Sequence, residues 1–209
     1  MAEKQVKLTN EQVNEEMNKM FNYIDNYPNK IKNLIGFKYN NLNTNYRAKL
    51  VKTPEYLFVF NDCYLNHKTA KVGKGSAAVR VYNNYSGLPI PRSFGIPLGY
   101  YKLAYRSLKE GILQINECIM EMIFLLSTYH YENVLYPIGN IDNPILGFAC
   151  GYEAKREIMS YITKCLLKLA KGGKFHVANE DFILDSYTIT DDIINSQCFM
   201  YESGNINNY

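Results

Sequence analysis

The chain has 209 residues, the size of a single domain, with 47% hydrophobic and 21% charged residues. These values exclude a disordered, collagen-like or supercharged protein, and 23 Lys and Arg against 20 Asp and Glu leave a net charge of only +3, which argues against a nucleic-acid partner. The N-terminal residues contain no apolar segment, and the most apolar stretch, 118–126, is too short to span a bilayer. We therefore expect a cytoplasmic protein with no membrane partner.

Cysteine and histidine show no pattern typical of a metal site. The five cysteines include no CxxC pair, and the three histidines lie far apart in the sequence. We expect reduced thiols, no metal and no cofactor.

The first quarter of the chain contains one clear helical pattern. A capping box at Thr9–Gln12 opens a helix that Pro28 ends, and we expect this helix to pack on the outside of the main domain. The Asn-rich segment from Gly36 to Asn45 is typical of a loop, and 47–52 partly alternates like an edge strand. Residues 55–60 are nearly all β-branched or aromatic, which predicts a central strand buried on both faces.

After a loop from Asn61 to Gly75 and a short element at 76–82, residues 94–98 predict a short strand that ends at its proline. The clearest helix begins at a second capping box, Ser107–Glu110. Its apolar positions step by four and three residues, as on one face of a helix: Leu108, Ile112, Ile115, Ile119, Met122 and Leu126.

The remaining pattern is strand, loop, helix, strand. We expect a buried strand at Asn133–Pro137, a helix at 153–170 that stops at Gly172 and Gly173, and a last strand at 182–189. Strands that alternate with helices predict an α/β fold, a three-layer α/β/α sandwich with a mixed sheet.

The predicted organisation has three parts. They are an N-terminal helical extension and loop at 1–45, an α/β domain at 46–190 and a C-terminal tail at 191–209.

Two loops follow predicted strands at the edge of the sheet where α/β proteins usually bind ligands. The first starts at Asn61 and Asp62 and ends at Gly73, Lys74, Gly75 and Ser76. Its glycines allow close approach of the backbone, and the start of the next helix would offer N–H groups to an anion. The alternative interpretation is a plain surface turn, since the loop matches neither the Walker A nor the GxGxxG pattern.

The second loop, 137–148, joins a strand to a helix. Its candidate ligand contacts are Gly139, Asn140, Gly147 and Phe148, with the glycines around a phosphate and either Phe148 or one of the many tyrosines stacked on a base. The alternative interpretation is a simple linker.

The order of these elements resembles that of macrodomains, which bind ADP-ribose and related nucleotides. The corresponding pattern is a strand, an Asn-bearing turn, a glycine-rich loop and a helix that opens with small residues, here 57–60, Asn61, 73–75 and 77–81. The chain is still more similar to an uncharacterised, often phage-borne family with a Phe-Gly-Asp-Asn, Gly-Lys-Gly-Gly-Gln-Ala, Gly-Ile-Pro-Thr and Pro-x-x-Gly-x-Gly signature. The matching segments are Phe60–Asp62, Gly73–Ala78, Gly95–Leu98 and Pro137–Gly139, and the resemblance covers 56–169.

The resemblance implies a nucleotide-type small-molecule ligand, with an ADP-ribose-type compound as the leading case and a role against host defence if the protein is phage-encoded. Asn61 or Asp62 would contact a ribose or orient a water. If the protein is a hydrolase of ADP-ribosyl or phosphodiester bonds, Asp62 or His67 is the candidate general base. The choice between binder and hydrolase stays open.

A second hypothesis is a ligand-free scaffold that binds a protein partner, a virion component or a second copy of itself. Tyrosine is a residue type favoured at interfaces. The candidate surface is therefore a group of five tyrosines: Tyr82, Tyr85, Tyr100, Tyr101 and Tyr105. A third hypothesis, nucleic-acid binding, rests only on the modest basic stretch 68–74.

Overall fold

The fold is described from a computed structural model of the chain. The structure describes residues 10–28, 31–38, 44–100, 103–105, 107–138, 156–179 and 182–195. The order of elements along the chain is a helix, a strand, a second helix and then a mixture of strands and helices.

A six-stranded sheet in the order β3-β2-β6-β1-β7-β8 forms the centre of the molecule. The strands are β1 (Asn33–Lys38), β2 (Tyr56–Asp62), β3 (Ser93–Pro97), β6 (Asn133–Pro137), β7 (Lys174–Asn179) and β8 (Phe182–Thr188). The first five run parallel, and β8 pairs antiparallel with β7. A separate antiparallel pair joins β4 (Gly99–Tyr100) to β5 (Leu103–Ala104).

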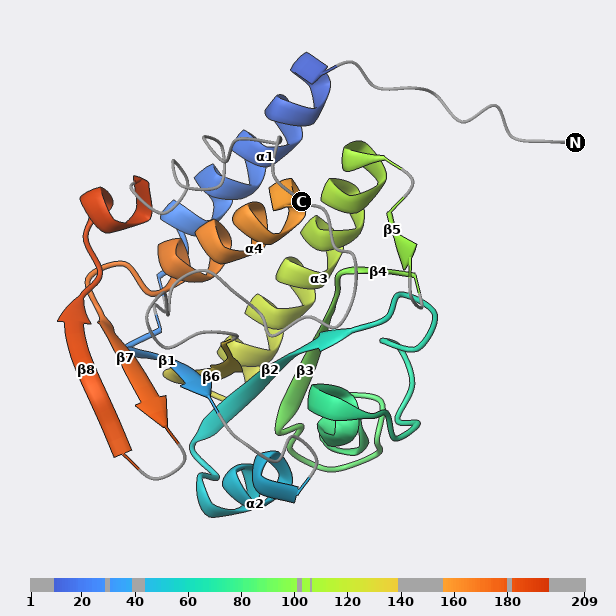
Figure 1. Cartoon of the computed structure of the whole chain (residues 1–209). Helices are drawn as coiled ribbons and strands as arrows, with labels where there is room; N and C mark the ends of the chain where they lie inside the picture. Colours follow the sequence, from blue (N-terminus) through green and yellow to red (C-terminus); the bar gives the residue numbers. More distant parts are fainter. Residues whose placement is uncertain are drawn as a thin grey trace, which may run out of the picture.

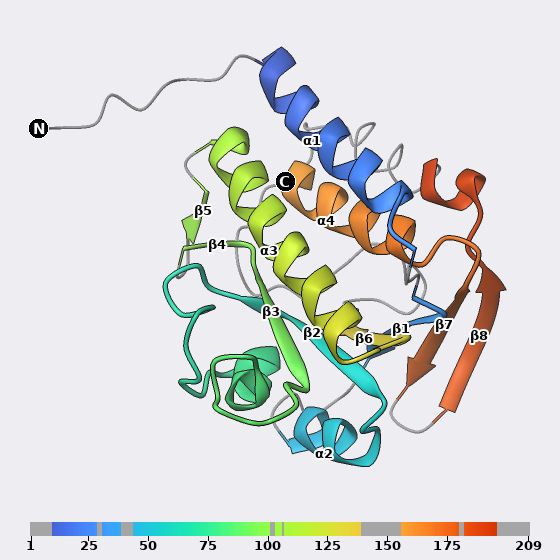
Figure 2. The same ribbon diagram turned by 180° about the vertical axis from the view of Figure 1, so that it is seen from behind.

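Helices cover both faces of this sheet (Figures 1 and 2). One face carries α1 (Asn10–Asp25), α3 (Leu108–Thr128) and α4 (Arg156–Leu169), and the other carries α2 (Thr44–Lys52) and the 3-10 helix η1 (Gly75–Tyr82). The chain is therefore an α/β sandwich with a mixed sheet, which confirms the predicted fold class.

Strand β2 shows why its sequence is almost continuously apolar. Leu57 and Val59 join the core cluster beneath α1, α3 and α4, whereas Phe58 and Phe60 join the cluster beneath α2 and η1. Because successive side chains of a strand point to opposite faces, a strand covered on both sides needs apolar residues at every position. The prediction of a central, doubly buried strand is confirmed.

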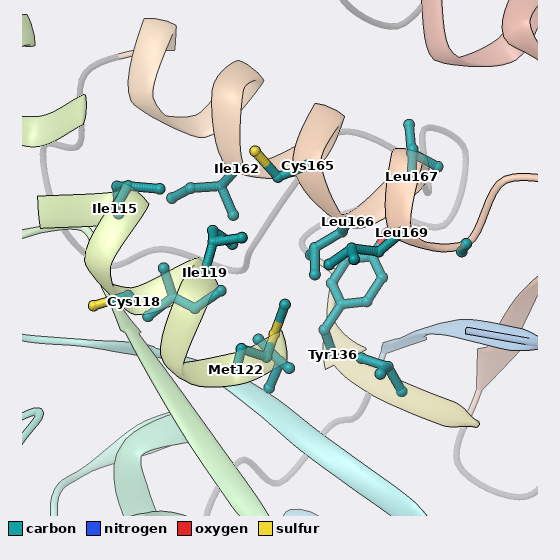
Figure 3. Close-up of a cluster of buried hydrophobic side chains, with 14 of the residues drawn as sticks. Ile115, Cys118, Ile119, Met122, Tyr136, Ile162, Cys165, Leu166, Leu167 and Leu169 are labelled. Atoms are coloured by element: carbon teal, nitrogen blue, oxygen red, sulfur yellow. The ribbon is translucent and has the colours of Figure 1, made fainter. Parts of the chain in front are cut away.

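Helix α3 matches its predicted capping box and core face. The Ser107 side chain accepts a hydrogen bond from the Glu110 N–H at 3.1 Å and so caps the helix. Five of the six predicted positions, Ile112, Ile115, Ile119, Met122 and Leu126, are buried, and Leu108 is partly buried. Figure 3 shows side chains of α3 meeting those of α4 and Tyr136 of β6.

Helix α3 is also long and apolar enough to cross a membrane, judged by length and composition alone. Half of its most apolar window is buried inside the fold. Core helices meet the same criterion, so the criterion alone is weak support for a membrane span.

The N-terminal region differs from the prediction. Gly36, Phe37 and Lys38 were expected in a loop, but they belong to β1, which lies between β6 and β7. Helix α1 places Val13, Met20 and Ile24 in the main core. The segment before residue 45 therefore supplies a central strand as well as a packed helix, because pairing partners far away in the sequence stabilise a run too short to be recognised by itself.

Two further differences concern short elements. Residues 47–52 form part of α2, not an edge strand, with Leu50 buried against the sheet. β7, which the prediction omitted, follows Gly172 and Gly173 and buries Phe175 and Val177. Short alternating runs fit either period, so the tertiary contacts decide between helix and strand.

Candidate functional site

The first predicted ligand loop leaves the sheet at the carboxyl end of β2. Asn61 and Asp62 close the strand, with exposed fractions of 3% and 2%, and pair in register with Ile96 and Pro97 of β3. The chain then turns through 63–74 and enters η1 at Gly75. Since β3, β2, β6, β1 and β7 are parallel, their carboxyl ends share this edge of the sheet.

Asp62 forms a buried ion pair with Arg80, a residue of η1. Arg80 donates from Nε to Oδ2 of Asp62 at 2.9 Å and from Nη2 to Oδ1, and the Cys63 N–H donates to Oδ1 at 2.7 Å. The Asp62 side chain has no exposed surface. Burial raises the pKa of Asp62, and Arg80 and the Cys63 N–H offset part of that effect.

This pairing changes the predicted role of Asp62. Both carboxylate oxygens already accept hydrogen bonds, and neither faces solvent. A general base must reach the proton that it abstracts. Asp62 is therefore placed as the internal counter-ion of Arg80 and not as a base that a substrate can approach.

Arg80 also holds the loop. Its Nη1 donates to the Lys71 carbonyl at 2.8 Å, and Asn83 Nδ2 donates to the Thr69 carbonyl at 2.8 Å. The Gly73 N–H donates to the Ala77 carbonyl at 3.0 Å. We call Arg80, Asp62 and Asn83 the loop clamp, because together they fix the path of the backbone from 69 to 73.

The predicted ligand residues of this loop have different environments. Gly73 packs so closely on η1 that a Cβ atom would lie 2.6 Å from Ala77 Cβ and 3.2 Å from Arg80 Nη1. Since its N–H is also occupied, Gly73 serves packing and not direct anion binding. Gly75 has a φ of 61°, which favours glycine. Lys74 is exposed, and its side chain does not cap η1.

Ser76 belongs to η1, and its side chain lies outside the described residues. Every predicted contact of the second loop also lies outside them: Gly139, Asn140, Gly147 and Phe148. Their predicted role therefore stays a prediction.

His67 lies in a ring cluster beside the clamp. It is 7% exposed, and its Nδ1 is 2.6 Å from the Tyr64 carbonyl, so Nδ1 carries the proton and donates. Its ring centroid is 5.1 Å from that of Tyr64, which in turn makes edge contacts with Tyr100 and Tyr105. His67 and Asp62 are thus neighbouring residues of one buried region, and among the described residues no hydrogen-bond partner is seen for His67 Nε2.

The four described tyrosines of the predicted face have different environments, and Tyr82 packs against the core cluster beneath α2 and η1. Tyr105 is buried and donates to the Pro97 carbonyl at 2.9 Å, and Tyr100 donates to Glu110. Tyr85, in contrast, is 38% exposed and donates to Glu121 at 3.1 Å. Tyr101 lies outside the described residues.

Arg80 is the residue that the sequence analysis missed. Its signal was a single cation in the apolar run Ala77–Tyr82. A charge inside an apolar segment needs a buried partner, and Asp62, at the end of the preceding strand, is the nearest acidic residue before it in the chain.

Comparison with known proteins identifies no relative: no family model, curated protein or solved structure matches the chain. No group of three or more His, Cys, Asp or Glu side chains suited to a metal comes together within the described ranges.

Proposed function

We propose that the protein binds a phosphate-bearing ligand of nucleotide type at the carboxyl edge of β2. The observation that carries the proposal is the loop clamp, which fixes the turn leading to Lys74 and Gly75 through Arg80 and Asn83. A turn that is already ordered costs less conformational entropy when it receives a ligand. The macrodomain resemblance of the sequence supports an ADP-ribose-type compound.

The proposed contacts come from the start of η1. Lys74 supplies a positive charge, and Gly75 supplies a backbone that reaches a left-handed conformation without a side chain in the way. The first N–H groups of a helix have no acceptor within the helix, so they are available to phosphate oxygens. Because Asp62 is paired with Arg80 and unavailable as a base, we propose that the protein binds its ligand without turnover. If turnover is found, His67 is the base to test.

The direct test is isothermal titration with ADP-ribose, NAD, a cyclic dinucleotide and inorganic phosphate. At Gly75, the substitutions Gly75→Asp and Gly75→Asn make a matched pair, since both residues tolerate positive φ and differ mainly in charge. We expect Gly75→Asp to weaken binding about tenfold or more and Gly75→Asn to weaken it less.

Gly87 provides the control because it also has a positive φ, 75°, and a Cβ atom there would meet nothing within 4 Å. Gly87→Asp adds the same charge on the same kind of backbone, away from the proposed site, and we expect it to leave affinity unchanged. Absence of heat with all four compounds, or equal affinity of Gly75→Asp and Gly75→Asn, would overturn the proposal.

A further inference from the structure

The outward side of α3 carries an apolar stripe that is partly exposed to solvent. Leu113, Met120 and Phe124 have exposed fractions of 36%, 40% and 68%. With Glu117 between them, these positions step by four, three and four residues, which is the spacing of a seam that packs against another helix. Helix α3 thus has two seams, one that faces the core and one that faces outward.

Two shallow hollows follow this outward seam. One has a volume of about 610 Å³ and lies between α1 and α3, where Glu16 and Glu117 line it. The other has a volume of about 470 Å³ and places Leu88 and Phe124 on its walls. Met120 and Glu121 line both hollows, so they form one continuous surface. We call this surface the α3 groove.

The charged residues that line the α3 groove are all carboxylates: Glu16, Glu117 and Glu121. Two lysines from outside the lining reach two of them, with Lys19 2.8 Å from Glu16 and Lys68 3.3 Å from Glu121. In the part of the chain that the structure describes, Glu117 has no such ion pair. An apolar floor with carboxylates along it is complementary to a helix that has one apolar side and basic residues beside it.

We propose that the α3 groove binds a basic amphipathic helix of a partner protein. The apolar side of that helix would cover Met120 and Phe124, and its lysines or arginines would approach Glu117. Large exposed aromatic side chains of this kind supply much of the binding energy at interfaces. The proposal does not rest on the ligand site, because none of the residues that line the groove belongs to the loop clamp or to the turn at 73–75.

The test uses three synthetic peptides of about 18 residues, long enough to form an amphipathic helix when bound. The first combines Leu on one side with Lys on the other, the second replaces every Lys by Glu, and the third scrambles the first. Fluorescence anisotropy of labelled peptides on the full chain is expected to detect the Leu/Lys peptide only. Phe124→Ala and Glu117→Lys should each weaken its binding about tenfold or more.

Val51→Ala is the matched control, because Val51 is 59% exposed on α2, on the opposite side of the sheet. We expect it to leave binding unchanged, and circular dichroism should show that all three variants keep the native fold. Equal binding of the Leu/Glu or the scrambled peptide would overturn the proposal, as would no binding at all.

Two other outcomes would assign the groove to a different occupant and overturn the proposal. One is a dimer in sedimentation experiments that Phe124→Ala dissociates, which would identify a second copy of the chain. The other is binding to phosphatidylcholine vesicles that Phe124→Ala abolishes, which would identify a lipid surface.

Discussion

The carboxyl end of β2 buries charged side chains, whereas the outward side of α3 exposes an apolar one. The first buries two charges, Asp62 and Arg80, whose side chains are 0% and 5% exposed. The second leaves Phe124 68% exposed, although the next residue towards the N-terminus, Ile123, is only 3% exposed.

The two regions differ in whether the described residues supply a partner for the unusual side chain. Two buried charges are stable only when they satisfy each other, and here the pair also binds the loop backbone at Lys71. An exposed aromatic ring has no such internal partner in the described residues, and this exposure is why we propose a binding partner for it. The ion pair therefore supports the proposed ligand site, and the apolar stripe supports the proposed interface.

The largest expected effect comes from breaking the ion pair. Arg80→Met should lower the free energy of unfolding by about 3–5 kcal/mol, since it leaves the Asp62 carboxylate buried without its counter-ion. Urea unfolding measures this loss. The double variant Asp62→Leu with Arg80→Met should recover part of it, and a loss below about 1 kcal/mol in Arg80→Met alone would show that the pair is not buried in solution.

Two glycines test how rigid each region is. A Cβ atom at Gly95 would lie 2.5 Å from Asp62 Oδ2, and one at Gly111 of α3 would meet the end of Ile158 and lie 2.9 Å from Tyr105 Cδ2. Asp62 is fixed by Arg80, whereas the end of an isoleucine can move and alanine also favours the helix. Thermal unfolding should show Gly95→Ala destabilised by about 1–3 kcal/mol and Gly111→Ala by less. The reverse order would contradict the rigidity of the clamp.

A smaller effect should appear when the pH is lowered. His176 of β7 donates from Nε2 to Asn33 Oδ1 at 3.0 Å, and its Nδ1 is buried with no partner in the described residues. Burial lowers the pKa of His176 below 6.5. The unfolded chain therefore binds more protons as the pH falls from about 7 towards that lowered pKa, and stability decreases.

Melting temperatures across this pH range provide the measurement for His176. His176→Gln should remove part of the decrease and leave the remainder of the profile unchanged. An identical profile in the variant would show that another group is responsible.

The smallest expected effect on stability is at the exposed stripe. Phe124→Ala should change the free energy of unfolding by less than about 0.5 kcal/mol, because its side chain is already largely in solvent. Ile123→Ala, one position away, should cost about 2–5 kcal/mol. Urea unfolding of both variants compares them directly, and equal losses would mean that Phe124 is part of the core.

The sequence was most informative where one element could be recognised from its own residues. Ser107 and the regular apolar steps from Leu108 to Leu126 predicted α3, and the apolar run before Asn61 predicted a doubly covered strand. Both features depend on the spacing of residues that are close together in the sequence. The predictions for β1 and α2 were wrong because such short segments acquire a definite structure only from partners far away in the sequence. For Asn33–Lys38 these partners are β6 and β7.

The candidate site followed the same division. The sequence located Asp62, His67 and the turn at 73–75 after a buried strand, because an apolar run followed by a turn with glycines can be recognised from neighbouring residues. It did not reveal that Asp62 is occupied by Arg80 or that the Gly73 N–H is bound to Ala77.

By itself, the sequence determined the α/β class, the central strand, the long core helix and the position of the first loop, since each is encoded by hydrophobic period and capping residues. Only the tertiary structure decided that β1 lies at the centre of the sheet, that Asp62 serves Arg80 and that Phe124 faces outward. The physical reason is that burial and charge pairing depend on groups brought together across many residues, and such proximity is not a property of any single segment.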